Sequence, residues 1–232
     1  MRSLAIKLGA ALLLASSVAT AQNTIIQGRV SASPGLFDFK FNAPGIGSES
    51  GDGTIIALDT GLSLIFLNES GGAFLTDLEL EAMEIDSGES GADASFNRTD
   101  LKFTAGYQFP SRIAPIVGYR YAAQGDGVFD DESYTEAGYF VGVGYSGIPL
   151  GEFATLGGSV AYNATTLDFP GQSEDLDADG ASARIALNLN EKPLSFSLRY
   201  QVFQVDEPTF DFDESYLLLS VTYTYFSKVL GQ

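Results

Sequence analysis

The sequence contains no histidine and no cysteine, and its 12 Lys and Arg residues are outnumbered by 30 Asp and Glu residues. Without cysteine the chain can form neither disulfides nor thiolate metal sites. Without histidine it lacks the usual general base near neutral pH and any Ser-His-Asp arrangement, so we expect no enzymatic activity. The formal net charge of -18 excludes nucleic acid as an expected partner, because phosphate binding needs a basic surface.

Long hydrophobic runs are missing after position 21, so the sequence predicts no membrane helix in that part of the chain. Residues 1–21 have the layout of a secretory signal peptide. Arg2 and Lys7 provide a positive start, 8–18 is apolar, and a small-x-small triplet ends at Ala21. We expect cleavage after Ala21, and an uncleaved N-terminal membrane anchor is the alternative.

Apolar and polar side chains alternate with a period of two through most of the remaining sequence. In the segment TDLKFTAGYQF, for example, Leu101, Phe103 and Tyr107 alternate with Asp100 and Lys102. Such alternation indicates β-strands and not helices. We expect ten strands, with eight or twelve as alternative counts. The predicted spans are 35–42, 54–67, 73–86, 97–109, 114–123, 134–147, 152–164, 181–190, 194–205 and 215–226.

The connections between these strands alternate in length. The short ones are 68–72, 110–113, 148–151 and 191–193, and the long ones are 43–53, 87–96, 124–133, 165–180 and 206–214. This asymmetry is typical of outer-membrane barrels, which have short periplasmic turns and longer external loops. It predicts both termini on the short-turn side. The expected organisation is a signal peptide at 1–21, an N-terminal periplasmic segment at 22–34, a barrel at 35–226 and a C-terminal tail at 227–232.

The polar face of the predicted strands is rich in Gly, Ser, Thr, Asn and Gln, with a few charges of both signs. Small polar side chains suit the lumen of a membrane barrel whose apolar residues face lipid, whereas a soluble barrel carries its charges outside. Aromatic residues near strand ends suggest interfacial girdles: Phe66, Phe109, Tyr119, Tyr121, Tyr134, Phe153, Phe203, Tyr223 and Tyr225. The sequence therefore favours an all-β fold, a closed antiparallel transmembrane β-barrel. A secreted soluble β-barrel that binds a small apolar ligand is the alternative.

The last predicted strand, SYLLLSVTYTYF, places Leu217, Leu219 and Tyr225 on one face and ends at Phe226. It resembles the C-terminal strand of Gram-negative outer-membrane barrels, which their assembly machinery recognises. That strand usually ends the chain at an aromatic residue, whereas here Ser227–Gln232 follow Phe226. With the signal peptide and strand pattern, nearly the whole mature chain resembles the small, porin-like outer-membrane β-barrel proteins. The resemblance implies a place in the cell outer membrane and names no activity. It implies as partners membrane lipid, lipopolysaccharide and the barrel-assembly machinery, and we expect a monomer.

Charged residues on the predicted lumen face form the candidate site. They are Asp77, Glu79, Glu81, Asp100, Lys102, Arg120, Arg184 and Arg199. Arginines and carboxylates facing each other across a narrow bore can form ion pairs that plug it, or they can line an ion-selective pore. A ten-stranded barrel is only slightly wider than the eight-stranded type, whose interior is filled by side chains. We therefore favour a plugged or very narrow lumen with a structural or surface-interaction role, and porin-like passage of small solutes is the alternative.

Acidic residues concentrate in the predicted long loops. The run Asp175-Leu-Asp177-Ala-Asp179-Gly matches the first half of a calcium loop, with oxygen ligands at alternate positions and a turning glycine. The match then ends, because Ala186 stands where a bidentate glutamate is required. We expect no firmly bound cofactor and at most weak Ca²⁺ or Mg²⁺ binding by Asp175, Asp177 and Asp179. The alternative is a solvated acidic loop beside cation-bridged lipopolysaccharide.

Overall fold

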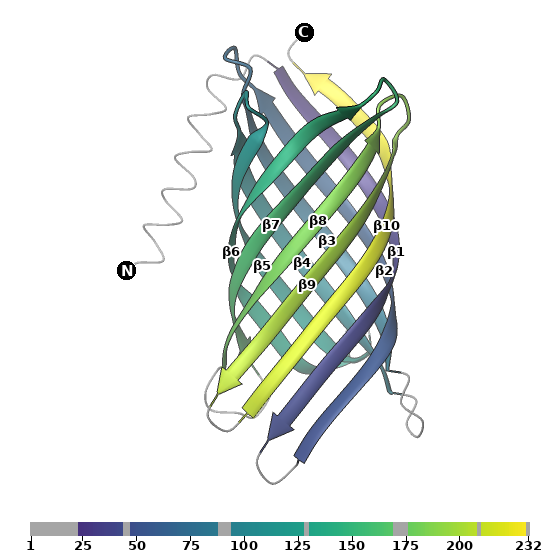
Figure 1. Ribbon diagram of the computed structural model, residues 1–232, viewed down its shortest axis with the longest axis vertical. Coiled ribbons are helices and arrows are strands. Elements are labelled where there is room, and N and C mark those ends of the chain that lie inside the picture. The colour runs from purple at the N-terminus through teal and green to yellow at the C-terminus, as the bar shows by residue number, and fades with distance from the viewer. Residues whose placement is uncertain are drawn as a thin grey trace, which may run out of the picture.

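The computed structural model describes residues 23–43, 47–87, 94–127, 130–168, 176–207 and 210–230, which form one closed barrel (Figure 1). The strands are β1 (Asn23–Ala43), β2 (Gly47–Leu67), β3 (Ala73–Ser87), β4 (Ala94–Gln108), β5 (Ile113–Gly127), β6 (Asp130–Leu150), β7 (Ala154–Asp168), β8 (Leu176–Leu189), β9 (Leu194–Glu207) and β10 (Phe210–Leu230). Each strand pairs antiparallel with its neighbours in sequence, and β1 closes the sheet by pairing with β10. The predicted fold class and the count of ten strands are confirmed. Within the described residues, no helix is long and apolar enough to cross a membrane.

The first and last strands extend beyond the boundaries expected from the sequence. β1 begins at Asn23, so the described part of the predicted periplasmic segment belongs to the barrel, and β10 continues through the predicted tail to Leu230. Thr24 and Leu230 are partners in the closing ladder. The early part of β1 was not predicted as a strand because it has few large apolar residues on its outward face, where Val30 and Ala32 lie. The predicted signal peptide, 1–21, lies outside the described residues.

The two ends of the barrel differ. At what we call the turn end, short connections at 68–72, 109–112, 151–153 and 190–193 join the strands, and β1 begins and β10 ends there, as predicted for the termini. At the opposite, hairpin end, the strands continue through most of the segments expected to be long loops. β2, for example, begins at Gly47 and β6 at Asp130. The expected long loops at 43–53 and 124–133 are therefore largely strand.

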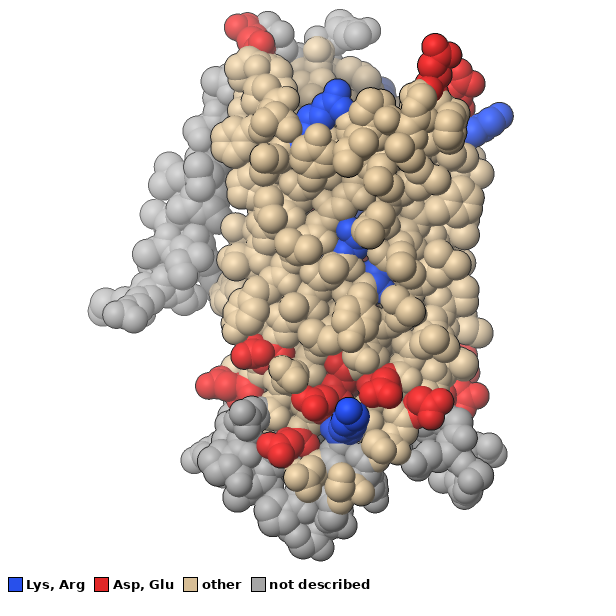
Figure 2. Space-filling model, in the orientation of Figure 1, with Lys and Arg blue, Asp and Glu red and all other residues tan. Residues whose placement is uncertain are grey.

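The side on which the apolar residues lie reverses along single strands. On β3, Leu78 and Leu80 are exposed on the outside, but beyond them Met83 and Ile85 are buried inside the barrel while Glu84 faces out. The same change occurs on β1, β7, β8, β9 and β10. We call the exposed, outward-facing carboxylates of the hairpin end the acidic ring. Its members are Asp38, Asp52, Glu84, Asp86, Asp168, Asp177, Asp179, Asp211 and Asp213. Several of its members form the red band across the lower part of Figure 2.

Between the acidic ring and the turn end, the outer surface is an apolar belt. It includes the exposed side chains of Leu58, Leu62, Leu80, Leu101, Val117, Val141, Val160, Ile185, Leu198 and Leu219. A contiguous apolar surface of this extent marks contact with lipid or with another protein. Most of the predicted girdle aromatics lie on the outside, including the exposed Tyr119 and Tyr223. Tyr134 and Phe203 do not, and that part of the prediction is wrong: both lie inside the barrel, in an apolar cluster at the hairpin end, because the reversal changes their face.

Candidate functional site in the barrel lumen

A fully buried ion-pair network crosses the lumen inside the barrel, near its hairpin end. Arg98, on β4, is 2% exposed and lies among the carboxylates of Asp100, Glu136 and Glu214. Its Nε is 3.0 Å from Asp100 Oδ1, and its Nη1 is 3.3 Å from Glu214 Oε1. Arg120, on β5, contacts Asp100 and Glu136 as well, so two guanidinium groups share three carboxylates. We call these five residues the Arg98 network.

Tyrosine hydroxyls extend this network towards the hairpin end. Arg98 Nη1 donates to Tyr134 Oη at 3.2 Å and to Tyr216 Oη at 3.3 Å. Tyr134 Oη in turn lies 3.3 Å from Glu214 Oε2. Buried charges are tolerated when they are paired and their remaining hydrogen-bonding positions are filled, and the Arg98 network meets that requirement.

Two apolar clusters fill the lumen between the Arg98 network and the hairpin end, and together we call them the plug. One cluster contains Phe37, Ile55, Ala57, Met83, Ile85, Tyr216 and Leu218, and the other contains Tyr134, Leu167, Ala178, Phe203 and Val205. The ring of Phe37 stacks on Phe39 and meets Phe96 edge-on, with centroids 5.7 and 5.6 Å apart. Inward apolar side chains thus give this end of the barrel a core like that of a soluble protein.

Every strand contributes to the closure. One inward residue from each, taken in order from β1 to β10, is Phe37, Ile55, Ile85, Arg98, Ala122, Glu136, Leu167, Ala178, Val205 and Tyr216. All ten are between 0 and 7% exposed. A water-filled channel would expose the side chains that line it. At the level of the plug and the Arg98 network, the described lumen is lined by buried side chains from all ten strands.

The other half of the lumen is a vestibule, a polar cavity of about 480 Å³ that extends from the Arg98 network towards the turn end. Gln27, Asn188 and Thr224 lie in its wall near the turn end, whereas Asp100 and Arg120 lie at its deep end. Most of its lining is only half-buried, in contrast to the plug. The lumen is therefore closed at one end and hollow at the other.

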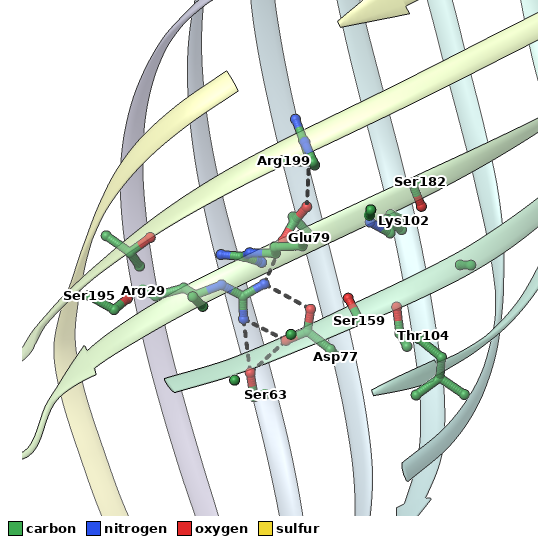
Figure 3. A pocket seen from close by; sticks show the side chains of 18 of the residues that line it. Arg29, Ser63, Asp77, Glu79, Lys102, Thr104, Ser159, Ser182, Ser195 and Arg199 are labelled. Atoms are coloured by element: carbon green, nitrogen blue, oxygen red, sulfur yellow. Dashed lines mark hydrogen bonds and ion pairs between the residues drawn. The ribbon is translucent and has the colours of Figure 1, made fainter. Parts of the chain in front are cut away.

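Ion pairs occupy the carboxylates of the vestibule wall (Figure 3). Arg29 donates to Asp77 Oδ2 at 2.8 Å and to Glu79 Oε2 at 2.6 Å, and Ser63 also contacts Asp77. From the opposite side Arg199 pairs with Glu81, and its Nη1 is 3.9 Å from Glu79 Oε1. Glu79 thus lies between two arginines that come from β1 and β9.

Two cations of the vestibule are without such a partner. Among the described residues, neither Lys102 nor Arg184 forms an ion pair or a side-chain hydrogen bond, although the Lys102 ammonium lies 5.7 Å from the centre of the Phe140 ring. In the ladders Lys102 is directly opposite Glu79 on β3 and Arg120 on β5, and Arg184 is directly opposite Ser159 on β7 and Arg199 on β9. Like charges in directly opposed positions repel, so each of these two cations has one unfavourable neighbour in the sheet.

All eight charged residues singled out from the sequence line this vestibule: Asp77, Glu79, Glu81, Asp100, Lys102, Arg120, Arg184 and Arg199. Sequence reasoning missed Arg29, Arg98, Glu136 and Glu214. Arg98 and Glu136 lie an even number of positions before lumen residues of the same strand, so they face the same side. This period-two spacing could have identified them. Arg29 and Glu214 were missed because 22–34 was assigned to a periplasmic segment and 206–214 to a loop.

The calcium prediction involves residues outside the lumen. Asp177 and Asp179 lie on β8, exposed on the outer surface, and Tyr162 Oη is 3.3 Å from Asp179 Oδ2. Asp175 lies outside the described residues. A calcium loop requires a turn, whereas this segment is extended, and no group of three potential ligands meets within the described part of the chain. Binding of Ca²⁺ or Mg²⁺ here stays a prediction.

No protein-family model and no curated protein sequence matches the chain. Solved structures do resemble it. The beta domain of the Bordetella autotransporter BrkA aligns with 85% of this chain and 98% of its own, at 9% identity and a TM-score of 0.45. An outer-membrane channel from Pseudomonas putida F1 aligns over 88% and 95%, at 12% identity and a TM-score of 0.39. The outer-membrane protein OprG from Pseudomonas aeruginosa aligns over 89% and 97%, at 12% identity and a TM-score of 0.35. The chain is thus similar to outer-membrane β-barrels, and the likeness names no activity.

Proposed function

We propose that this protein is an outer-membrane β-barrel whose lumen is a dead-end vestibule and not a diffusion pore. The apolar belt supports the membrane assignment, because a closed antiparallel sheet satisfies every backbone group within the bilayer and its outward apolar side chains suit lipid. The observation that carries the proposal is the closure by inward, buried residues from all ten strands. In this assignment the barrel has a structural or binding role in the membrane.

The orientation follows from the two ends. Outer-membrane barrels keep short turns in the periplasm and longer hairpins outside, so the turn end faces the periplasm. The vestibule then opens to the periplasm, and the plug and the acidic ring face the cell exterior. The acidic ring consists of carboxylates, which favour water over hydrocarbon, and this is consistent with a position outside the hydrocarbon layer.

The absence of cysteine allows a direct test, because each introduced cysteine is the sole thiol of the protein. Ser182 is half-buried in the vestibule wall, whereas Ser33 is inward-facing, 1% exposed and hydrogen-bonded to Ser220 at 2.8 Å. In detergent both ends of the barrel meet water, so labelling by a small thiol reagent measures access within the lumen. Ser182→Cys should react readily, and Ser33→Cys should react only after unfolding.

Planar-bilayer recordings complete the test. The proposal expects no single-channel conductance from the folded, membrane-extracted protein. Stepwise conductance together with rapid labelling of Ser33→Cys would instead establish the narrow-pore alternative. Recovery of the protein in the soluble fraction without detergent would overturn the membrane assignment itself.

A further inference from the structure

The vestibule offers hydrogen-bond donors with no acceptor assigned to them. Its four carboxylates are already engaged: Asp77 and Glu79 by Arg29, Glu81 by Arg199, and Asp100 by Arg98 and Arg120. Lys102 and Arg184 are the cations of this cavity left without an ion pair among the described residues. What the wall has available for a ligand is therefore positive charge and N–H donors.

Hydroxyl groups accompany these two cations. Ser159 is directly opposite Arg184 in the β7–β8 ladder, and Ser182 and Thr104 line the same cavity. No side-chain hydrogen bond joins any of these three hydroxyls to the described protein. Figure 3 shows Lys102, Ser182, Ser159 and Thr104 to the right of Arg29 and Glu79, with Ser159 and Thr104 next to Asp77. Ammonium, guanidinium and hydroxyl donors together match the oxygen atoms of a carboxylate or a phosphate.

From this arrangement we propose that the vestibule binds a small oxyanion, a carboxylate or a phosphate, at a site formed by Lys102 and Arg184. The proposal rests on the periplasmic vestibule proposed above and names the class of its ligand. A cavity of about 480 Å³ is within the range of small-molecule sites, roughly 300–1,000 Å³. The oxyanion compensates the two cations that the fold places against Arg120 and Arg199, and it enters from the turn end.

Isothermal titration calorimetry on the detergent-solubilised protein tests this, with inorganic phosphate and with succinate as separate probes at constant ionic strength. We expect saturable binding of at least one probe, weakened about tenfold by Lys102→Met and about tenfold by Arg184→Met, since each removes a charged donor. Lys40→Met is the matched control, because Lys40 is exposed on the outside at the hairpin end. It should bind like the wild type, and Lys102→Arg should retain binding.

A gain of affinity provides an independent readout. Glu79 competes with the oxyanion for the positive charge of the vestibule, so Glu79→Gln should bind the probe more tightly than the wild type. A second readout compares reagents of opposite charge. The Ser182→Cys thiol should react faster with an anionic thiosulfonate than with a cationic one, and Lys102→Met should reduce that ratio.

Absence of saturable binding by either probe, or equal loss in the Lys40→Met and Lys102→Met variants, would overturn the oxyanion site. That result differs from failure of the proposed function. A vestibule that labels at Ser182→Cys without conductance and without binding would refute only the ligand, whereas conductance would refute the dead-end lumen.

Discussion

Replacing Arg98 with methionine tests how far the closed end of the lumen depends on one buried guanidinium. Arg98 contacts the carboxylates of Asp100, Glu136 and Glu214 and the hydroxyls of two tyrosines. Methionine keeps much of the apolar stem but removes the charge and all five donors. The variant therefore leaves three buried carboxylates beside one remaining cation, Arg120.

The size of the effect follows from which carboxylate loses its partner. Breaking a buried ion pair costs about 3–5 kcal/mol, because the remaining charge stays buried without compensation. Asp100 and Glu136 keep their contacts with Arg120. Glu214 forms no other ion pair within the described residues. We therefore expect Arg98→Met to lower the free energy of unfolding by about 3–5 kcal/mol, mainly through Glu214.

Equilibrium urea unfolding of the protein in lipid vesicles measures this loss. The double variant Arg98→Met/Glu214→Gln should recover at least about 1 kcal/mol of it, since the two sites share one interaction. Lys192→Met, in an exposed turn, is the control and should change stability by less than about 0.5 kcal/mol. A loss below about 1 kcal/mol for Arg98→Met, or no recovery in the double variant, would refute the view that this network is a paired and desolvated unit.

The remaining predictions concern the outer surface and the sheet packing. Val141→Arg, in the apolar belt, should destabilise the vesicle-embedded protein by about 2–4 kcal/mol, whereas Gln204→Arg, at the level of the acidic ring, should cost at most about 1 kcal/mol. Equal costs measured by urea unfolding would contradict the position assigned to the membrane. Gly138→Ala should cost about 1–3 kcal/mol, because its Cβ would lie 2.2 Å from the Ala164 carbonyl oxygen. Gly144→Ala, whose Cβ has no neighbour closer than 3.7 Å, should change stability by less than about 1 kcal/mol. Similar losses of stability in the two variants would show that β6 and β7 do not approach closely at Gly138.

Alternation and turn length were enough to predict the closed barrel, its ten strands and the side on which the termini lie. Both signals are local, and the strands that carry them clearly, such as β4 and β9, were located within a few residues. The failures at the hairpin end have one physical cause, which differs from that of the missed start of β1. A period-two pattern says that two faces differ but not which of them faces water, and at the hairpin end the apolar face turns inward.

The candidate site shows the same limit. The period-two alternation predicted Glu79 and Lys102 on the lumen face, because every second side chain of a strand points to the same side. Which cation pairs with which carboxylate depends on the register of strands far apart in sequence, such as β1 and β3 for Arg29 and Asp77. No local pattern contains that information, so the pairing of Arg29 and the isolation of Arg184 became evident only in the folded barrel.

In the membrane orientation proposed above, the reversal of the apolar face also fixes how deep the barrel sits. Sliding it towards the periplasm would draw carboxylates such as Asp177 and Asp179 into hydrocarbon, where charged side chains on the lipid face are unfavourable. Sliding it outwards would expose Val141 and its neighbours to water. The acidic ring therefore limits how far the barrel can move along the membrane normal. In bilayers of different thickness, the lipid and not the protein should adjust at that boundary, so the plug would stay above the membrane whatever the bilayer around it.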